Sequence, residues 1–270
     1  MVVLVASACA RGEPAHTYPT GPDDLVIRID RVGGFQPIQA LLFEPSILAV
    51  FGDGTVVRQS ARPEIYPGPA LAGFESIRLS EQGLRSVVAR AVDAGLAGGD
   101  KELPDGRIAD AATTVFTTTI DGQTSVVRAH ALGEGDSSIE RVRANRFVVL
   151  LEGLENWLPP EDIVSTGDFE PKRLQIVSQP EAVSGQEAPE ELQIGEVAWP
   201  LPTPLSSFGQ PFSGLDGSRC GEVNNEELGP FLTALSEANA ITRWVSEGTK
   251  YLLFPRILLG DQEACVSQSS

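Results

Sequence analysis

The sequence predicts an α+β protein built from two modules, each an antiparallel sheet of hairpins packed against one or two helices. Xaa-Gly pairs at Asp53-Gly54, Asp121-Gly122 and Glu247-Gly248 each separate two strand-like runs. They predict hairpins, because tight hairpin turns need positive φ. Apolar residues spaced three and four apart in residues 84–92 and 142–154 predict one helix each. Strands in hairpins that alternate with single helices are typical of α+β folds.

The strands of the N-terminal module, expected over residues 25–158, follow from alternation and composition. Residues 25–31 alternate apolar and charged side chains, the pattern of a half-buried strand. Two apolar runs flank Asp53-Gly54. A hairpin rich in β-branched residues turns at Asp121-Gly122, and β-branched residues favour strands.

The helices of this module are bounded by capping signals. Ser80 is expected as the N-cap of the first helix, which should end near Gly95. Ser137 and Glu140 form a capping-box pattern for the second. Pro159 is expected to stop that helix.

The C-terminal module is expected over residues 172–266. Residues 159–171 are rich in Pro, Glu, Ser and Gly and are expected to be an interdomain linker, and 267–270 a tail. Short strands are expected near residues 173–179 and 195–201, and a helix that begins at Pro230. The third hairpin closes the module.

The charge balance excludes several partners. The net charge is −17 and the sequence pI about 4.5. Such an acidic surface repels phosphate backbones, so no nucleic-acid partner is expected. No apolar run reaches the ~20 residues of a membrane span. Membrane attachment is therefore expected only through a lipid anchor.

The first 24 residues are expected to be a truncated signal with a lipobox and a flexible tether. Ala6, Ser7 and Ala8 precede Cys9 at the end of an apolar run. This pattern resembles the lipobox of bacterial lipoproteins, which implies lipidation of Cys9 and an extracytoplasmic location. A buried strand that carries a free cysteine remains the alternative.

The other two cysteines are Cys220 and Cys265. An even pair that remains after a lipidated cysteine is typical of a disulfide in an oxidising compartment. Two unpaired buried thiols are the alternative. Neither cysteine belongs to a C-x-x-C pair, so the spacing of zinc or thioredoxin-like sites is missing.

The sequence predicts no catalytic, cofactor-binding or metal-binding residues. His16 and His130 are the two histidines, and neither has a second ligand at metal-binding spacing. Phosphate-binding loops and nucleophile elbows are absent from the sequence. Asp100, Asp105 and Asp110 share one loop but match no calcium-binding register.

Aromatic residues gather in the C-terminal module. Packing in the core is one interpretation, and a partly exposed patch for a partner is the other. The candidate patch consists of Trp199, Phe208, Phe212, Trp244 and Tyr251.

Several longer segments carry a further resemblance, among them ASAC, DDLVIRID, FGDGTVV, AWPLPTPL, RCGEV and ANAITRWVSEGTKYLLFPRILLGDQEAC. Together they resemble a group of uncharacterised exported lipoproteins of actinobacteria and related bacteria. The resemblance implies export and a bond between Cys220 and Cys265. It implies no activity.

These observations favour a membrane-anchored extracytoplasmic lipoprotein that acts as a non-enzymatic binding or scaffold protein. A protein, a peptide or an envelope polymer is the expected partner. One alternative is an extracytoplasmic hydrolase that uses two carboxylates within about 5–10 Å of each other. An inhibitor-like module is another.

Overall fold

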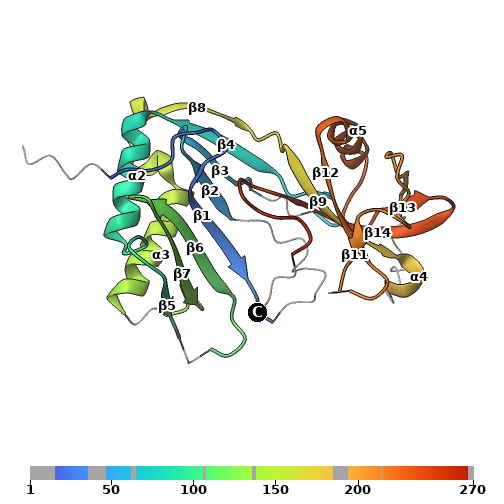
Figure 1. The fold of residues 1–270 in the computed structure, drawn as a ribbon, viewed down its shortest axis with the longest axis horizontal. Helices are drawn as coiled ribbons and strands as arrows, with labels where there is room; N and C mark the ends of the chain where they lie inside the picture. Colours follow the sequence, from blue (N-terminus) through green and yellow to red (C-terminus); the bar gives the residue numbers. More distant parts are fainter. Residues whose placement is uncertain are drawn as a thin grey trace, which may run out of the picture.

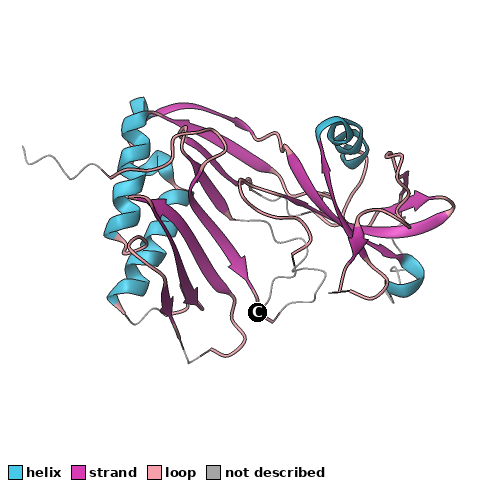
Figure 2. Cartoon of the chain, in the orientation of Figure 1, coloured by secondary structure: helices cyan, strands magenta, loops and turns pink. Residues whose placement is uncertain are grey.

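The computed structural model describes residues 16–35, 47–61, 65–105, 108–135, 138–184, 194–213 and 215–266. These residues form an α+β fold with two mixed, mostly antiparallel sheets and four helices, which confirms the predicted class (Figure 2). All strands before residue 169 belong to an eight-stranded sheet, and all strands after it belong to a six-stranded sheet.

The eight-stranded sheet contains the two predicted N-terminal hairpins. Its strands are β1 (Leu25–Val32), β2 (Leu48–Phe51), β3 (Thr55–Gln59), β4 (Phe74–Leu79), β5 (Lys101–Leu103), β6 (Thr113–Ile120), β7 (Gln123–His130) and β8 (Ile163–Asp168). Their order is β5-β7-β6-β1-β2-β3-β4-β8, and only β5 and β7 pair in parallel. The turns fall at Asp53-Gly54 and Asp121-Gly122, as predicted.

Two helices cover one face of this sheet. They are α2 (Glu81–Asp93) and α3 (Ile139–Glu152), which Figure 1 shows side by side on the face farthest from the six-stranded sheet. Ser80 caps α2 as predicted, because its hydroxyl accepts the N–H of Gly83. The cap of α3 is Ser138 and not Ser137, since the Ser138 hydroxyl accepts the N–H of Arg141 at 3.2 Å.

The first hydrophobic core lies between these helices and the sheet. Ile29 and Phe116 from the sheet pack in one cluster with Val88 of α2 and Phe147 of α3, all at most 1% exposed. Arg141 is buried among them and donates to the carbonyls of Leu103 and Ala131, which ties α3 to the β5 edge.

The segment expected as a linker is instead part of the sheet. Residues 159–171 contain a short 3₁₀ turn, Pro160–Asp162, and the strand β8, which pairs antiparallel with β4. Five of its six residues are exposed, as an edge strand allows. Because most of its residues face solvent, the composition of β8 is similar to that of a linker.

The six-stranded sheet contains β9 (Arg173–Pro180), β10 (Glu196–Ala198), β11 (Gln210–Pro211), β12 (Arg219–Asn224), β13 (Arg243–Ser246) and β14 (Thr249–Ile257). Their order is β10-β13-β14-β9-β12-β11, with β10 and β13 parallel. The β13–β14 hairpin turns at Glu247-Gly248, as predicted. The sheet carries the short helix α4 (Glu181–Ser184) and the helix α5 (Asn225–Ser236).

Helix α5 begins one turn earlier than predicted, with Pro230 inside it. The proline removes one backbone hydrogen bond near the start of the helix. Glu226 and Glu227 in the first turn interact favourably with the helix dipole, and Phe231 and Leu235 bury the inner face. Leu228, in the part of the helix before Pro230, packs against the second core and so stabilises the extra turn.

A second hydrophobic core joins the two sheets. Ala49, Phe51 and Phe74 of the eight-stranded sheet belong to the same buried cluster as Leu174 and Trp244 of the six-stranded sheet. The first sheet is therefore covered on both faces, by helices on one and by the C-terminal elements on the other. The two predicted modules share a core and are not separated by a linker.

Part of the segment predicted as a flexible tether is also packed. Thr17 donates its N–H to Asp121 at 2.8 Å, and Tyr18 packs against the first core. A Cβ on Gly52 would lie 2.2 Å from the carbonyl oxygen of Pro19, so only glycine allows this close approach. Residues 16–24 therefore belong to the folded body.

Candidate functional site

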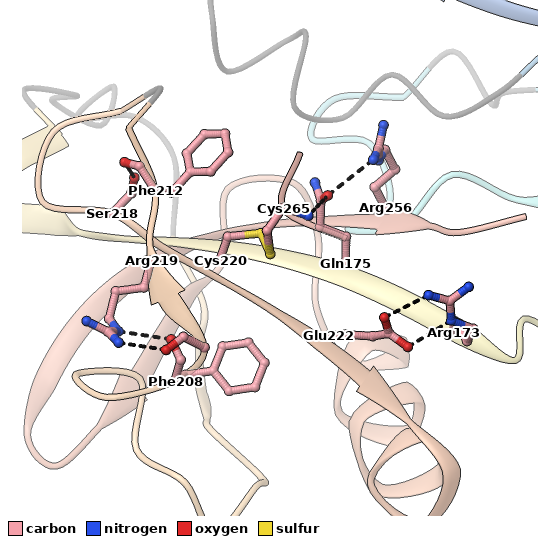
Figure 3. The surroundings of a disulfide bond; sticks show 11 residues. Arg173, Gln175, Phe208, Phe212, Ser218, Arg219, Cys220, Glu222, Arg256 and Cys265 are labelled. Carbon is pink, nitrogen blue, oxygen red and sulfur yellow. Dashed lines mark hydrogen bonds and ion pairs between the residues drawn. A yellow bond between two sulfur atoms is a disulfide. The ribbon is translucent and has the colours of Figure 1, made fainter. Parts of the chain in front are cut away.

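The predicted disulfide is formed. Cys220 on β12 bonds to Cys265, and their Cα atoms are 5.5 Å apart (Figure 3). Cys220 is fully buried, whereas Cys265 is partly exposed. Because disulfides persist in oxidising environments, the bond indicates an oxidising, extracytoplasmic location.

Gln175 connects the disulfide to a buried arginine. Its side-chain oxygen accepts the N–H of Cys265 at 2.8 Å and an Nη2–H of Arg256 at 3.1 Å (Figure 3). Burial lowers the pKa of Arg256, although the charge of Asp30 opposes this effect. The segment that carries Cys265 is thus held to β9 by a hydrogen bond and to β12 by the disulfide.

The loop at residues 208–209 lies close to β12, the strand that carries Cys220. Arg219 donates to the carbonyls of Phe208 and Gly209, at 2.9 and 2.7 Å (Figure 3). Gly209 has φ +58°, and a Cβ there would lie 1.9 Å from the carbonyl oxygen of Cys220. No other residue fits this contact.

A bidentate ion pair joins β9 and β12 near the disulfide. Nε and Nη2 of Arg173 each lie 2.8 Å from a carboxylate oxygen of Glu222 (Figure 3). The hydrogen bonds from Arg173 are the main reason that the pKa of Glu222 is lowered from its usual value. A carboxylate with a lowered pKa stabilises the fold above its unfolded-state pKa and loses this effect as the pH falls.

We therefore expect Glu222→Gln to reduce the acid sensitivity of the fold. The pair should contribute about 1 kcal/mol at pH 7, because it is partly exposed to solvent. This contribution should disappear as the pH falls below about 4.5. Urea unfolding at pH 7 and pH 3 measures the difference. Glu170→Gln, at an exposed position outside any helix and without an ion-pair partner among the described residues, is the matched control, and equal behaviour of the two variants would contradict the prediction.

The aromatic residues considered as a partner patch lie mainly in the core. Trp199, Phe208, Trp244 and Tyr251 are at most 9% exposed, and Phe212 is partly buried. The rings of Trp199 and Phe208 meet edge to face, with centroids 5.3 Å apart. The structure therefore favours the core interpretation, since these side chains present almost no surface to a partner.

A groove between α2 and α3 is a site that the sequence analysis missed. It has a volume of about 560 Å³ and is lined by Arg90 of α2, by Arg143 and Arg146 of α3, and by Trp157. Phe147 and Leu150 are also among its lining residues. The guanidinium of Arg90 lies over the indole ring of Trp157, 5.8 Å from its centroid, within cation–π range.

The groove is rich in positive charge. Asp93 is its one carboxylate among the described lining residues, 3.8 Å from Arg90. Arg143 and Arg146 have no ion-pair partner among the described residues. The groove therefore fits an anion and lacks the second carboxylate that the hydrolase alternative needs.

A sequence signal for the groove did exist. Arg143 and Arg146 stand three residues apart and so share one face of α3. The sequence alone does not identify this face as part of a groove, because the closeness of these arginines to Arg90 depends on how α2 and α3 pack.

The remaining polar candidates have structural partners. His16 lies 2.8 Å from Asp121, and His130 lies 2.6 Å from the carbonyl oxygen of Ile108. Asp100 accepts the N–H of Val126, and Asp105 lies buried 3.9 Å from Arg141. In the described ranges, no three His, Cys, Asp or Glu residues gather as a metal site would require.

Among the described helices, none combines the length and apolar character needed to cross a bilayer. Cys9, the predicted lipidation site, lies outside the described residues.

The fold and site define a class: a two-sheet α+β protein with a shared core, one disulfide and an arginine-lined groove on its helical face. No family model matches the chain, and neither a curated protein nor a solved structure is similar to it.

Proposed function

We propose that this protein is an extracytoplasmic lipoprotein, held to a membrane by a lipid on Cys9, that acts as a binding or scaffold protein. The disulfide between Cys220 and Cys265 carries the proposal, because it requires an oxidising compartment. The small residues before Cys9 match the lipobox pattern.

The groove between α2 and α3 supports a binding role. Its three arginines surround an apolar surface, an arrangement that recognises an anionic group attached to an apolar one. The proposed ligand surface is thus this groove, and not the aromatic residues of the C-terminal half.

Cell fractionation and mass spectrometry test the anchor. We expect the protein in the membrane fraction of its native host, with a lipid on the peptide that contains Cys9, and we expect Cys9→Ala to release it. Cys220 and Cys265 should be found oxidised in both proteins. A bare Cys9 thiol together with reduced Cys220 and Cys265 would show that the proposed compartment is wrong.

A further inference from the structure

The charge of the molecule is distributed unevenly. Helices α2 and α3 together contain five arginines and four acidic residues, and because Arg141 is buried their other charges balance, in a chain whose net charge is −17. An anionic environment therefore repels the helical face less than the net charge of the chain suggests. Exposed charges more than about 8–10 Å away are screened at physiological salt, so the local balance decides contact.

The exposed side of α3 is also apolar. Ile139, Val142 and Val149 are 64%, 47% and 60% exposed and share one side of the helix with Arg143 and Arg146. Exposed aliphatic residues mixed with arginines are typical of helices that lie in the headgroup region of a bilayer. Trp157 beside them adds the residue type that prefers this interface.

The N-terminal end of the described chain lies beside the layer formed by α2 and α3. Tyr18 packs against the first core, which residues of α2 help to form, and Figure 1 shows this N-terminal segment crossing α2. His16 is seven residues from Cys9, and seven residues span at most about 25 Å. A lipid on Cys9 would thus hold the bilayer within about 25 Å of His16, next to the helical layer.

We propose that the face formed by α2 and α3 is the surface with which the anchored protein lies on an anionic bilayer, where Arg90, Arg143 and Arg146 bind headgroup phosphates. Guanidinium groups bind phosphate through charge-assisted hydrogen bonds. Ile139, Val142 and Val149 enter the region between headgroups and acyl chains. The two sheets then lie on the side of the helices away from the bilayer. This orientation rests on the anchoring proposed above.

The test attaches the oxidised full-length protein through the Cys9 thiol to a maleimide-bearing lipid in vesicles. Cys220 and Cys265 are bonded and do not react, so the attachment imitates the anchor whether or not the host adds a lipid. One set of vesicles contains phosphatidylglycerol and the other only phosphatidylcholine. Because every molecule is attached, the measurement reports orientation and not affinity.

Trp157 is the built-in probe. The other two tryptophans, Trp199 and Trp244, are buried in the second core. Trp244 lies on β13, which Figure 1 shows at the opposite end of the molecule from α2 and α3. A lipid with a nitroxide on its headgroup should quench the fluorescence of Trp157 when the helical face contacts the bilayer. We expect clear quenching on anionic vesicles and several-fold less on neutral vesicles.

The decisive variant is Arg143→Gln with Arg146→Gln. Each arginine next to an anionic surface should favour the orientation about fivefold, so this double variant should reduce its population relative to other orientations by about 25-fold. The matched control is Arg128→Gln with Lys250→Gln, which removes the same charge from two 47% exposed positions on β7 and β14. In the control, the fluorescence of Trp157 should be quenched as strongly as in the unmodified protein.

Two results would overturn the proposal. Equal quenching on anionic and neutral vesicles would show that headgroup charge does not orient the protein. Equal quenching of Trp157 fluorescence in the Arg143→Gln, Arg146→Gln variant and in the control would show that the groove arginines do not bind headgroups. Binding of an acidic peptide to the groove would then identify a protein as the ligand. Circular dichroism confirms that each variant is folded. The vesicle experiment does not depend on whether the host adds a lipid to Cys9. The proposed anchor and the proposed orientation can therefore be disproved independently.

Discussion

Replacement of Phe231 by alanine is expected to destabilise the entire described fold by about 3–5 kcal/mol. Phe231 is fully buried in α5, and its ring centroid lies 5.4 Å from that of Trp199 and 5.7 Å from that of Trp244. Removal of the ring loses both aromatic contacts and leaves a cavity that the surrounding strands cannot fill. Urea unfolding monitored by circular dichroism measures the change.

The shared core makes the form of this transition informative. Phe231 belongs to the cluster that also contains Phe51 and Phe74 of the eight-stranded sheet. We therefore expect one cooperative transition that shifts as a whole. The matched control is Phe35→Ala, the same change at a side chain that is 91% exposed, which should shift stability by less than about 0.5 kcal/mol. Two separate transitions, only one of which responds to Phe231→Ala, would contradict the shared core.

Reduction of the disulfide is expected to cost roughly 4 kcal/mol. Cys220 and Cys265 are 45 residues apart in the sequence, and a bond across this separation restricts the unfolded chain by about that amount. The loss should be visible as a lower urea midpoint in the presence of a reductant that keeps both thiols free.

The control for this prediction is the double variant Cys220→Ala, Cys265→Ala. Its midpoint should be low and should not respond to the reductant, which separates the effect of the disulfide from any effect of the reductant on Cys9. If the unmodified protein unfolds at the same urea concentration with and without reductant, the disulfide does not stabilise the fold.

Local sequence signals predicted individual elements well. The turns at Asp53-Gly54, Asp121-Gly122 and Glu247-Gly248 lie where expected, because each glycine adopts the positive φ that the turn needs, which is a property of the residue itself. Ser80 caps α2 for the same reason, since a hydroxyl at that position reaches a nearby backbone N–H.

Predictions failed where tertiary contacts outweigh local preference. Residues 163–168 resemble a linker, yet β4 offers them an unpaired edge, and they form β8. Pro230 is a signal for the start of a helix, but packing of Leu228 against the second core stabilises a turn before it. In both cases the deciding interaction comes from residues distant in the sequence.

The candidate site shows the same division. The pairing of Cys220 with Cys265 could be predicted, because two cysteines remain once Cys9 is assigned to the anchor. The burial of the aromatic residues could not be predicted, since the same side chains suit a core or a surface patch. The groove could not be predicted either. Arg90 and Arg143 are 53 residues apart in the sequence and line one groove only because α2 and α3 pack side by side on one sheet.

The sequence alone determined the fold class, most strands, the hairpin turns, the acidic character and the two cysteines that bond. These properties depend on composition and on residues close together along the chain. The tertiary structure decided that two sheets share a core, that residues 16–24 are packed, and that three arginines surround one groove. These properties depend on which surfaces exclude water together, and the packing of distant segments sets that.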